Sequence, residues 1–217
     1  AQESLKNIEE LKLILMHYSA LEIQTLRKGL QSSTGLQRLS LCQGNLTDGR
    51  SEELTAILSH NPQLLYLSLE YCKLQVECEN SGILAVAEAL PNCGQLEYLS
   101  LQGNRIANQA AAEIAKALKG HPNLSTLNIG HNHIGNKGAA ALIELASTIP
   151  TLKEVDLSWN LIGDKGAKLV IETLSTNRAM VEANSLIIKL HGNFRISEEM
   201  IRKMQKVFPE TIKLQLV

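Results

Sequence analysis

The chain is poor in aromatic residues, has almost no net charge and contains no long apolar run. Phe, Trp and Tyr make up 3% of its 217 residues, and the formal net charge is −1 with charged residues at 20%. Proteins that bind nucleic acids or membrane surfaces usually carry clustered basic charge, so this composition argues against both partners. No apolar run approaches the roughly 18 residues that a membrane-spanning helix needs. A chain of this length is nevertheless able to bury a sizeable core as one domain.

Catalytic and redox motifs are missing as well. The four cysteines (Cys42, Cys72, Cys78 and Cys93) form no Cys-x-x-Cys pair, which indicates reduced thiols in a reducing compartment. The sequence has no glycine-rich phosphate loop, no Gly-x-Ser-x-Gly and no His-Glu-x-x-His. A Cys–His nucleophile pair stays open, although no pattern selects one. His131 and His133 have a spacing that suits metal ligands, but no third ligand is evident. We therefore expect no metal, no cofactor and no enzymatic activity.

One pattern of apolar residues repeats along most of the chain. It reads Leu-x-x-Leu-x-Leu-x-x-Asn-x-Ile, with its first leucine taken as position 0. It fits from Leu64 with Cys72 in the asparagine position, and from Leu36 with Gly44 there. Weaker copies begin at 8 and near 185. Most starts lie 28 residues apart. The full copies are Leu96, Leu99, Leu101, Asn104, Ile106; Leu124, Leu127, Ile129, Asn132, Ile134; and Leu152, Val155, Leu157, Asn160, Ile162.

Each copy predicts a short strand, a turn and a helix. Residues 96–101 alternate apolar and polar side chains, whereas 107–118 are alanine-rich with apolar residues at helical spacing. One such unit is unable to bury its apolar face alone, so we expect the units to stack. Asn136 and Asp164 are predicted N-caps of two helices. An asparagine amide at the turn is able to bond the backbone of its own and the neighbouring loop. The predicted ladder of such residues is Asn104, Asn132, Asn160 and Asn193.

These repeats resemble leucine-rich repeats of the ribonuclease-inhibitor-like class. The segments IGNKGAAALIEL (134–145) and IGDKGAKLVIETL (162–174) look like that class, as found in Ran GTPase-activating protein, tropomodulin and NLR receptors. The resemblance implies an α/β horseshoe solenoid with a parallel sheet on its concave face and helices on its convex face. We predict one domain over 1–217 with about seven units, starting near 8, 36, 64, 96, 124, 152 and 185, and a last strand at 212–217. Two units are longer, and we expect surface loops near 76–81 and 176–184.

The repeat frame also predicts a protein-binding face. Positions 2 and 4 point outward from the sheet, and positions 6 and 7 line its rim. Three of the four tyrosines and the only tryptophan fall there, and these residue types dominate the energetics of protein interfaces. Alternatively, Tyr66 and Tyr98 only stack on each other as strand neighbours. Acidic residues are expected to give the middle of the face a mild negative character. The predicted partner-binding residues are Tyr66, Tyr71, Tyr98, Trp159, Glu154, Asp156, Arg38, His131 and Asn128.

We therefore predict a non-catalytic scaffold that binds a protein of unknown identity through the concave face. The start of the chain shows no signal-peptide pattern and no initiating Met, so we expect a piece of a larger cytoplasmic protein or assembly. The terminal repeats look uncapped, which predicts that further chain or a neighbouring subunit covers them. A ribonuclease-inhibitor role is disfavoured because the face is not strongly acidic. The regular period weakens an NLR-type assignment.

Two alternatives stay open at this point. The first is a structural subunit of a cytoskeletal or axonemal complex. The second follows from the resemblance to Ran GTPase-activating protein. It is an activator of a small Ras-like GTPase, in which Arg105, next to Asn104 at the turn, reaches the bound GTPase.

Overall fold

A single parallel sheet of eight strands runs through the whole computed structural model, in chain order from β1 to β8. The structure describes residues 7–14, 19–46, 50–75, 81–208 and 212–213. Each of the first seven strands begins two residues after one of the repeat starts named above. Residues 214–217 of the expected last strand lie outside the described residues. The strands are β1 (Glu10–Ile14), β2 (Arg38–Cys42), β3 (Tyr66–Ser68), β4 (Tyr98–Ser100), β5 (Thr126–Asn128), β6 (Glu154–Asp156), β7 (Ile187–Lys189) and β8 (Ile212–Lys213).

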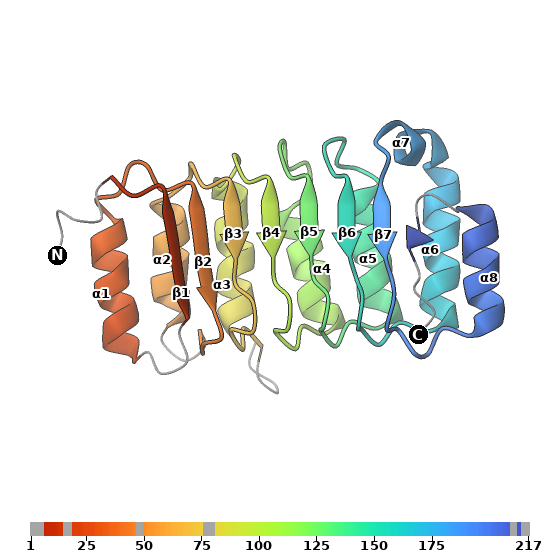
Figure 1. Ribbon diagram of the computed structural model, residues 1–217, viewed down its shortest axis with the longest axis horizontal. Helices are drawn as coiled ribbons and strands as arrows, with labels where there is room; N and C mark the ends of the chain where they lie inside the picture. The colour runs from red at the N-terminus through yellow and green to blue at the C-terminus, as the bar shows by residue number, and fades with distance from the viewer. Residues whose placement is uncertain (1–6, 15–18, 47–49, 76–80, 209–211, 214–217) are drawn as a thin grey trace.

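Helices follow the strands and cover one face of this sheet (Figure 1). The other face, here called the sheet face, carries no helix of the described residues (Figure 1). The predicted α/β solenoid with a parallel sheet is thereby confirmed. No helix in the described part of the chain is both long and apolar enough to cross a membrane. The helices are α1 (Ala20–Leu30), α2 (Ser51–Ser59), α3 (Ser81–Ala89), the 3-10 turn η2 (Leu90–Asn92), α4 (Asn108–Ala117), α5 (Asn136–Ala146), α6 (Asp164–Thr176), α7 (Arg178–Ala183) and α8 (Glu198–Val207).

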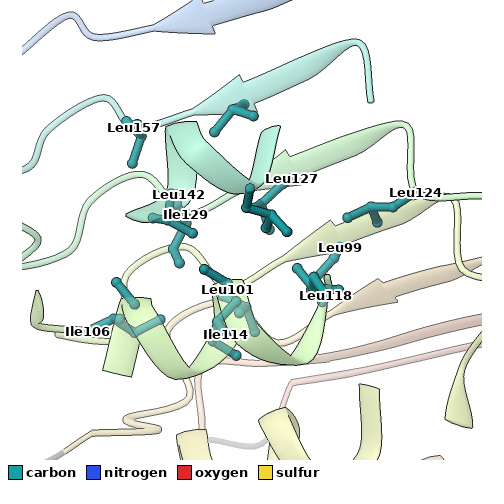
Figure 2. Packing of buried hydrophobic residues seen from close by; sticks show 14 of the residues in the cluster. Leu99, Leu101, Ile106, Ile114, Leu118, Leu124, Leu127, Ile129, Leu142 and Leu157 are labelled. Atoms are coloured by element: carbon teal, nitrogen blue, oxygen red, sulfur yellow. The ribbon is translucent and has the colours of Figure 1, made fainter. Parts of the chain in front are cut away.

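The core lies between the sheet and the helix layer. In the unit that contains β4, Leu99 of the strand, Leu101 directly after it and Ile114 of helix α4 all have no exposed surface. Figure 2 shows these side chains meeting those of the next unit. Burial of each such side chain stabilises the fold by about 1.5–3 kcal/mol. Alanines such as Ala111 on the buried face of α4 leave space for the helix to approach the sheet.

A buried row of asparagines ties each turn to the one before it. The Oδ1 atom of Asn132 accepts the N–H groups of Asn104 and Ile106, both at 2.9 Å. Its Nδ2 atom donates to the carbonyls of Leu101 and Ile129 at 3.1 and 3.0 Å. Asn104, Asn160 and Asn193 make corresponding bonds to the units that precede them. The side-chain amides thus satisfy buried backbone groups that no regular secondary structure pairs.

Cys72 replaces asparagine in this row and makes fewer bonds. Its Sγ atom donates to the carbonyl of Leu41 at 2.8 Å. Burial raises the pKa of this thiol to about 12, and burial likewise raises the pKa of Cys93 to about 11. Both thiols therefore stay protonated near neutral pH, which makes them poor nucleophiles. Cys42, Cys72 and Cys93 are free cysteines, and Cys78 lies outside the described residues.

The predicted N-caps were wrong, because each of these side chains caps the helix of the following unit instead. Helix α6 has Gly163 as its N-cap, and Asp164 is its first helical residue. The Oδ1 atom of Asn136 accepts the N–H groups of Gly163 and Gly166 at 2.9 and 3.0 Å. Asn108 does the same for α5, and Asp164 accepts the N–H of Ser197 before α8. A residue in the first turn of a helix lies beside the N-terminus of the neighbouring helix in the stack.

One of the two long units differs from the expectation of loops. Residues 178–183 form helix α7, so the insertion near 176–184 is largely helical. Residues 76–80 of the other insertion lie outside the described residues, and α3 begins at Ser81.

Candidate functional site

A row of stacked side chains crosses four strands of the sheet face. The rings of Tyr66 and Tyr98 lie parallel, with centroids 4.4 Å apart and planes 4° apart. The guanidinium carbon of Arg38 lies 4.3 Å from the centroid of the Tyr66 ring. Glu10 continues the row, with its Oε2 atom 3.6 Å from Nε of Arg38. The parallel register places these four residues opposite one another, so the alternative of strand-neighbour stacking describes their geometry.

The tyrosines stay partly accessible despite this stacking, since both are only half-buried. Burial raises the pKa of the Tyr66 phenol to about 12, and the neighbouring Tyr98 and Glu70 raise it further. The phenol is therefore neutral at physiological pH and is able both to donate and to accept a hydrogen bond. Ser68 and Ser100 lie two residues after the tyrosines on the same strands and are buried. Ser100 donates to Oε1 of Glu70 at 2.8 Å.

The carboxylates in the middle of the sheet face, which the sequence predicts to be mildly acidic, accept hydrogen bonds from neighbouring residues. Lys189 Nζ donates to Oε1 of Glu154 at 2.7 Å, an ion pair between adjacent strands. This bond and the nearby carboxylates raise the pKa of Lys189. Asp156 accepts the N–H of Ser158 at 2.9 Å and also its hydroxyl. Asn128 donates to Oε1 of Gln102 at 2.9 Å.

The remaining predicted residues form a second group at the turn after each strand. Position 7 of the repeat has positive φ in six units, from 52° to 71°. Glycine occupies it at Gly103 and Gly192, where a β-carbon would overlap the rings of Tyr71 and Trp159 respectively. Each ring thus lies directly against the glycine of the next unit. The position 7 residues are Gln43, Tyr71, Gly103, His131, Trp159 and Gly192.

Trp159 is the centre of an aromatic cluster in this second group. The imidazole of His131 stacks on the indole, with centroids 5.4 Å apart and planes 12° apart. Phe194 meets the indole edge-on, also at 5.4 Å. Phe194 is 75% exposed and Leu161 is 40% exposed. Sequence reasoning missed Phe194 and Leu161, although both stand at position 9 of the frame and were available from it.

No group of three or more His, Cys, Asp and Glu side chains in the part of the chain that the structure describes is arranged to hold a metal ion. Arg105, the residue considered for GTPase activation, is exposed and has a φ of 61°.

Comparisons with known proteins agree with the repeat architecture. The family model described as "Leucine Rich repeat" matches residues 120–142 and 148–170. No curated protein gives a significant sequence match. The structure of the Leiomodin-1 actin-binding site 2 is similar with a TM-score of 0.50 and 14% identity, over 65% of this chain and 82% of that one. A Bacteroides fragilis protein is similar with a TM-score of 0.59 and 15% identity, over 97% of this chain and 66% of that one. At these identities the likeness concerns the fold alone.

Proposed function

We propose that this chain, which contains leucine-rich repeats and has the fold of proteins built from them, is a non-catalytic scaffold that recognises a protein partner through its sheet face. The observation that carries this proposal is the row formed by Arg38, Tyr66 and Tyr98. These side chains are held in one geometry by stacking and yet remain partly accessible. A row that is already ordered loses little conformational entropy when a partner binds.

The composition of the chain strengthens the argument. Aromatic residues make up only 3% of the sequence, and two of the four tyrosines lie side by side on a face that no helix covers. Tyrosine and arginine are over-represented among residues whose truncation weakens protein interfaces most. The internally paired Glu154 and Lys189 lie farther along the same face. We assign them to the polar rim of the interface, with Asp156 and Asn128.

Actin is the first partner to test, because a protein of this fold is described as an actin-binding site of Leiomodin-1. An actin-binding role would fit a cytoskeletal assembly. The experiment is co-sedimentation with purified actin, together with a quantitative pull-down from cytosolic extract. Wild type is compared with a double variant, Tyr66→Ala and Tyr98→Ala.

The matched control is Leu84→Ala with Leu169→Ala, which truncates two exposed side chains of helices α3 and α6. If the sheet face binds, the tyrosine variant weakens a specific interaction by about 2 kcal/mol or more. The control then keeps that interaction. Loss of the same proteins from both variants, or from neither, would argue against the sheet face as the site.

A further inference from the structure

The turns that follow the strands present two parallel rows of side chains, at positions 7 and 9 of the repeat. We call this surface the strand-exit edge. Position 9 contributes exposed residues from five consecutive units. Neighbouring units in such a sheet are about 4.8 Å apart, so five units span about 19 Å. The position 9 residues are Lys73, Arg105, His133, Leu161 and Phe194; the position 7 row runs from Tyr71 to Gly192.

The charge along this edge has one sign. Neither row contains an Asp or Glu, and Lys73 and Arg105 are both exposed. Glu70 precedes Tyr71 by one position, outside both rows, and its carboxylate accepts the hydroxyl of Ser100. The two exposed cations of the rows favour a negatively charged partner.

The backbone of the edge has a conformation that is uncommon for residues other than glycine. Tyr71, Lys73, Arg105, His131 and Trp159 all have φ between 51° and 61°. This left-handed conformation is unfavourable for side chains of this kind and free of penalty for glycine. Bulky or charged side chains therefore stand where glycine would suit the backbone better. The conformation also occurs at Gln43 and at the glycines of position 7, so it belongs to the turn of the repeat.

Cations and apolar groups lie at opposite ends of the edge. Lys73 and Arg105 belong to the units that contain β3 and β4, whereas Trp159, Leu161 and Phe194 belong to those that contain β6 and β7. The exposed fractions of these three apolar side chains are 39%, 40% and 75%. A ligand that matches this edge carries negative charge at one end and an apolar group at the other.

We infer that the strand-exit edge binds an extended acidic segment of the partner protein, with carboxylates against Lys73 and Arg105 and an apolar side chain against Phe194 and the edge of Trp159. This inference rests on the proposed protein-recognition function and names the chemistry of the segment that is recognised. An extended chain advances about 3.3 Å per residue, so roughly six residues cover the edge.

A protein segment suits the edge better than single-stranded nucleic acid does. Nucleic acid binding relies on aromatic faces on which bases stack, interleaved with cations along the backbone path. The indole of Trp159 instead has His131 stacked on it and lies against the backbone of Gly192. Its accessible part is therefore mainly its edge, which suits contact with an aliphatic side chain.

The test uses Trp159 as its own reporter, because it is the only tryptophan in the chain. The probes are two synthetic ten-residue peptides that carry four glutamates at one end and two leucines at the other, in the two possible orders. The control peptide has glutamine in place of each glutamate. We expect one of the acidic peptides to shift the Trp159 emission until the signal saturates. Its binding should become about tenfold weaker when the salt concentration rises from 0.02 to 0.3 M.

Charge reversal then locates the site on the full chain. Lys73→Glu with Arg105→Glu is expected to weaken peptide binding by at least about tenfold. The matched control is Lys116→Glu with Lys119→Glu, which reverses two positive charges on and just after helix α4. It is expected to change the affinity for the peptide by less than about threefold. Phe194→Ala is expected to weaken binding of the acidic peptide and to leave the salt dependence of that binding unchanged. Circular dichroism shows whether each variant is folded.

Three results would overturn the inference. They are no emission shift with either acidic peptide, equal binding of the glutamine peptide, or an emission shift with oligo-dT in place of the peptides. The variant Tyr66→Ala with Tyr98→Ala separates this outcome from failure of the proposed function. If that variant loses a natural partner that the Lys73 and Arg105 reversal retains, the sheet face binds and the strand-exit edge does not.

Discussion

Tyr66 and Tyr98 lie face to face on adjacent strands, with their ring centroids 4.4 Å apart, and Arg38 covers the outer side of Tyr66. The pair belongs to two units whose starts are 32 residues apart, in the one place among the first six units where the 28-residue period is broken. The parallel register nevertheless puts the two side chains directly opposite each other. The longer unit has therefore placed its extra residues away from the strands.

A double-mutant cycle on Tyr66→Ala and Tyr98→Ala measures this contact. Stacked aromatic pairs contribute about 0.5–1.5 kcal/mol beyond the area that they bury. We expect a coupling of about 1 kcal/mol in the free energy of unfolding, measured by urea denaturation. Strict additivity of the two single changes would mean that the rings lie together without stabilising the fold.

Asn132→Ala is expected to be among the most damaging polar substitutions. The change removes an amide that accepts two buried N–H groups and donates to buried carbonyls. Each buried backbone group left without a partner costs about 1–3 kcal/mol. We therefore expect a loss of about 3 kcal/mol or more in urea denaturation. Asn92→Ala, at an exposed position, is the control and should stay within about 0.5 kcal/mol of wild type.

Asn136 tests the capping of one unit by another. Asn136→Ala removes the acceptor for two N–H groups at the start of α6, so we expect a loss of about 1–2 kcal/mol. Asn136→Asp keeps the acceptor and adds a negative charge beside a helix N-terminus, as Asp164 does in the next unit. It should therefore retain most of the stability. Equal destabilisation by the alanine and aspartate variants would contradict this role.

His121 is expected to make folding stability depend on pH. Its Nε2 atom donates to the carbonyl of Cys93 at 3.1 Å, and its Nδ1 atom accepts the N–H of Leu124 at 3.2 Å. Burial lowers the pKa of this imidazole, since the charged form would lose its hydration and its acceptor nitrogen. The stabilising contribution of neutral His121 is therefore complete above the unfolded-state pKa near 6.5 and falls as the pH drops from there toward the lower folded-state pKa.

The measurement is the free energy of unfolding of wild type and His121→Asn between pH 8 and pH 5. Asparagine is a suitable replacement because Asn61 stands at the equivalent position, three residues before Leu64, and is buried there. We expect the advantage of wild type over the variant to shrink toward pH 5. A difference that does not change with pH would show that His121 does not titrate in this range.

Much of the fold follows directly from the order of residues in the chain. The spacing of Leu96, Leu99 and Leu101 requires a strand with one buried face, and the same spacing recurs in later units. All of these side chains are buried. The row of buried asparagines follows from the same frame, because an amide at the turn is able to donate and accept at once. These features depend on which face of one unit a residue occupies, and periodicity encodes that face.

The tertiary structure decided what depends on contacts between units. Asn136 caps the helix of the following unit, and Glu154 is neutralised by Lys189 on the next strand. Phe194, with no partner visible in its own unit, joins Trp159 in an exposed cluster. Each of these contacts joins residues 27 to 35 positions apart. Such contacts depend on strand register and on the rotamers of both partners, neither of which the period of a single repeat contains.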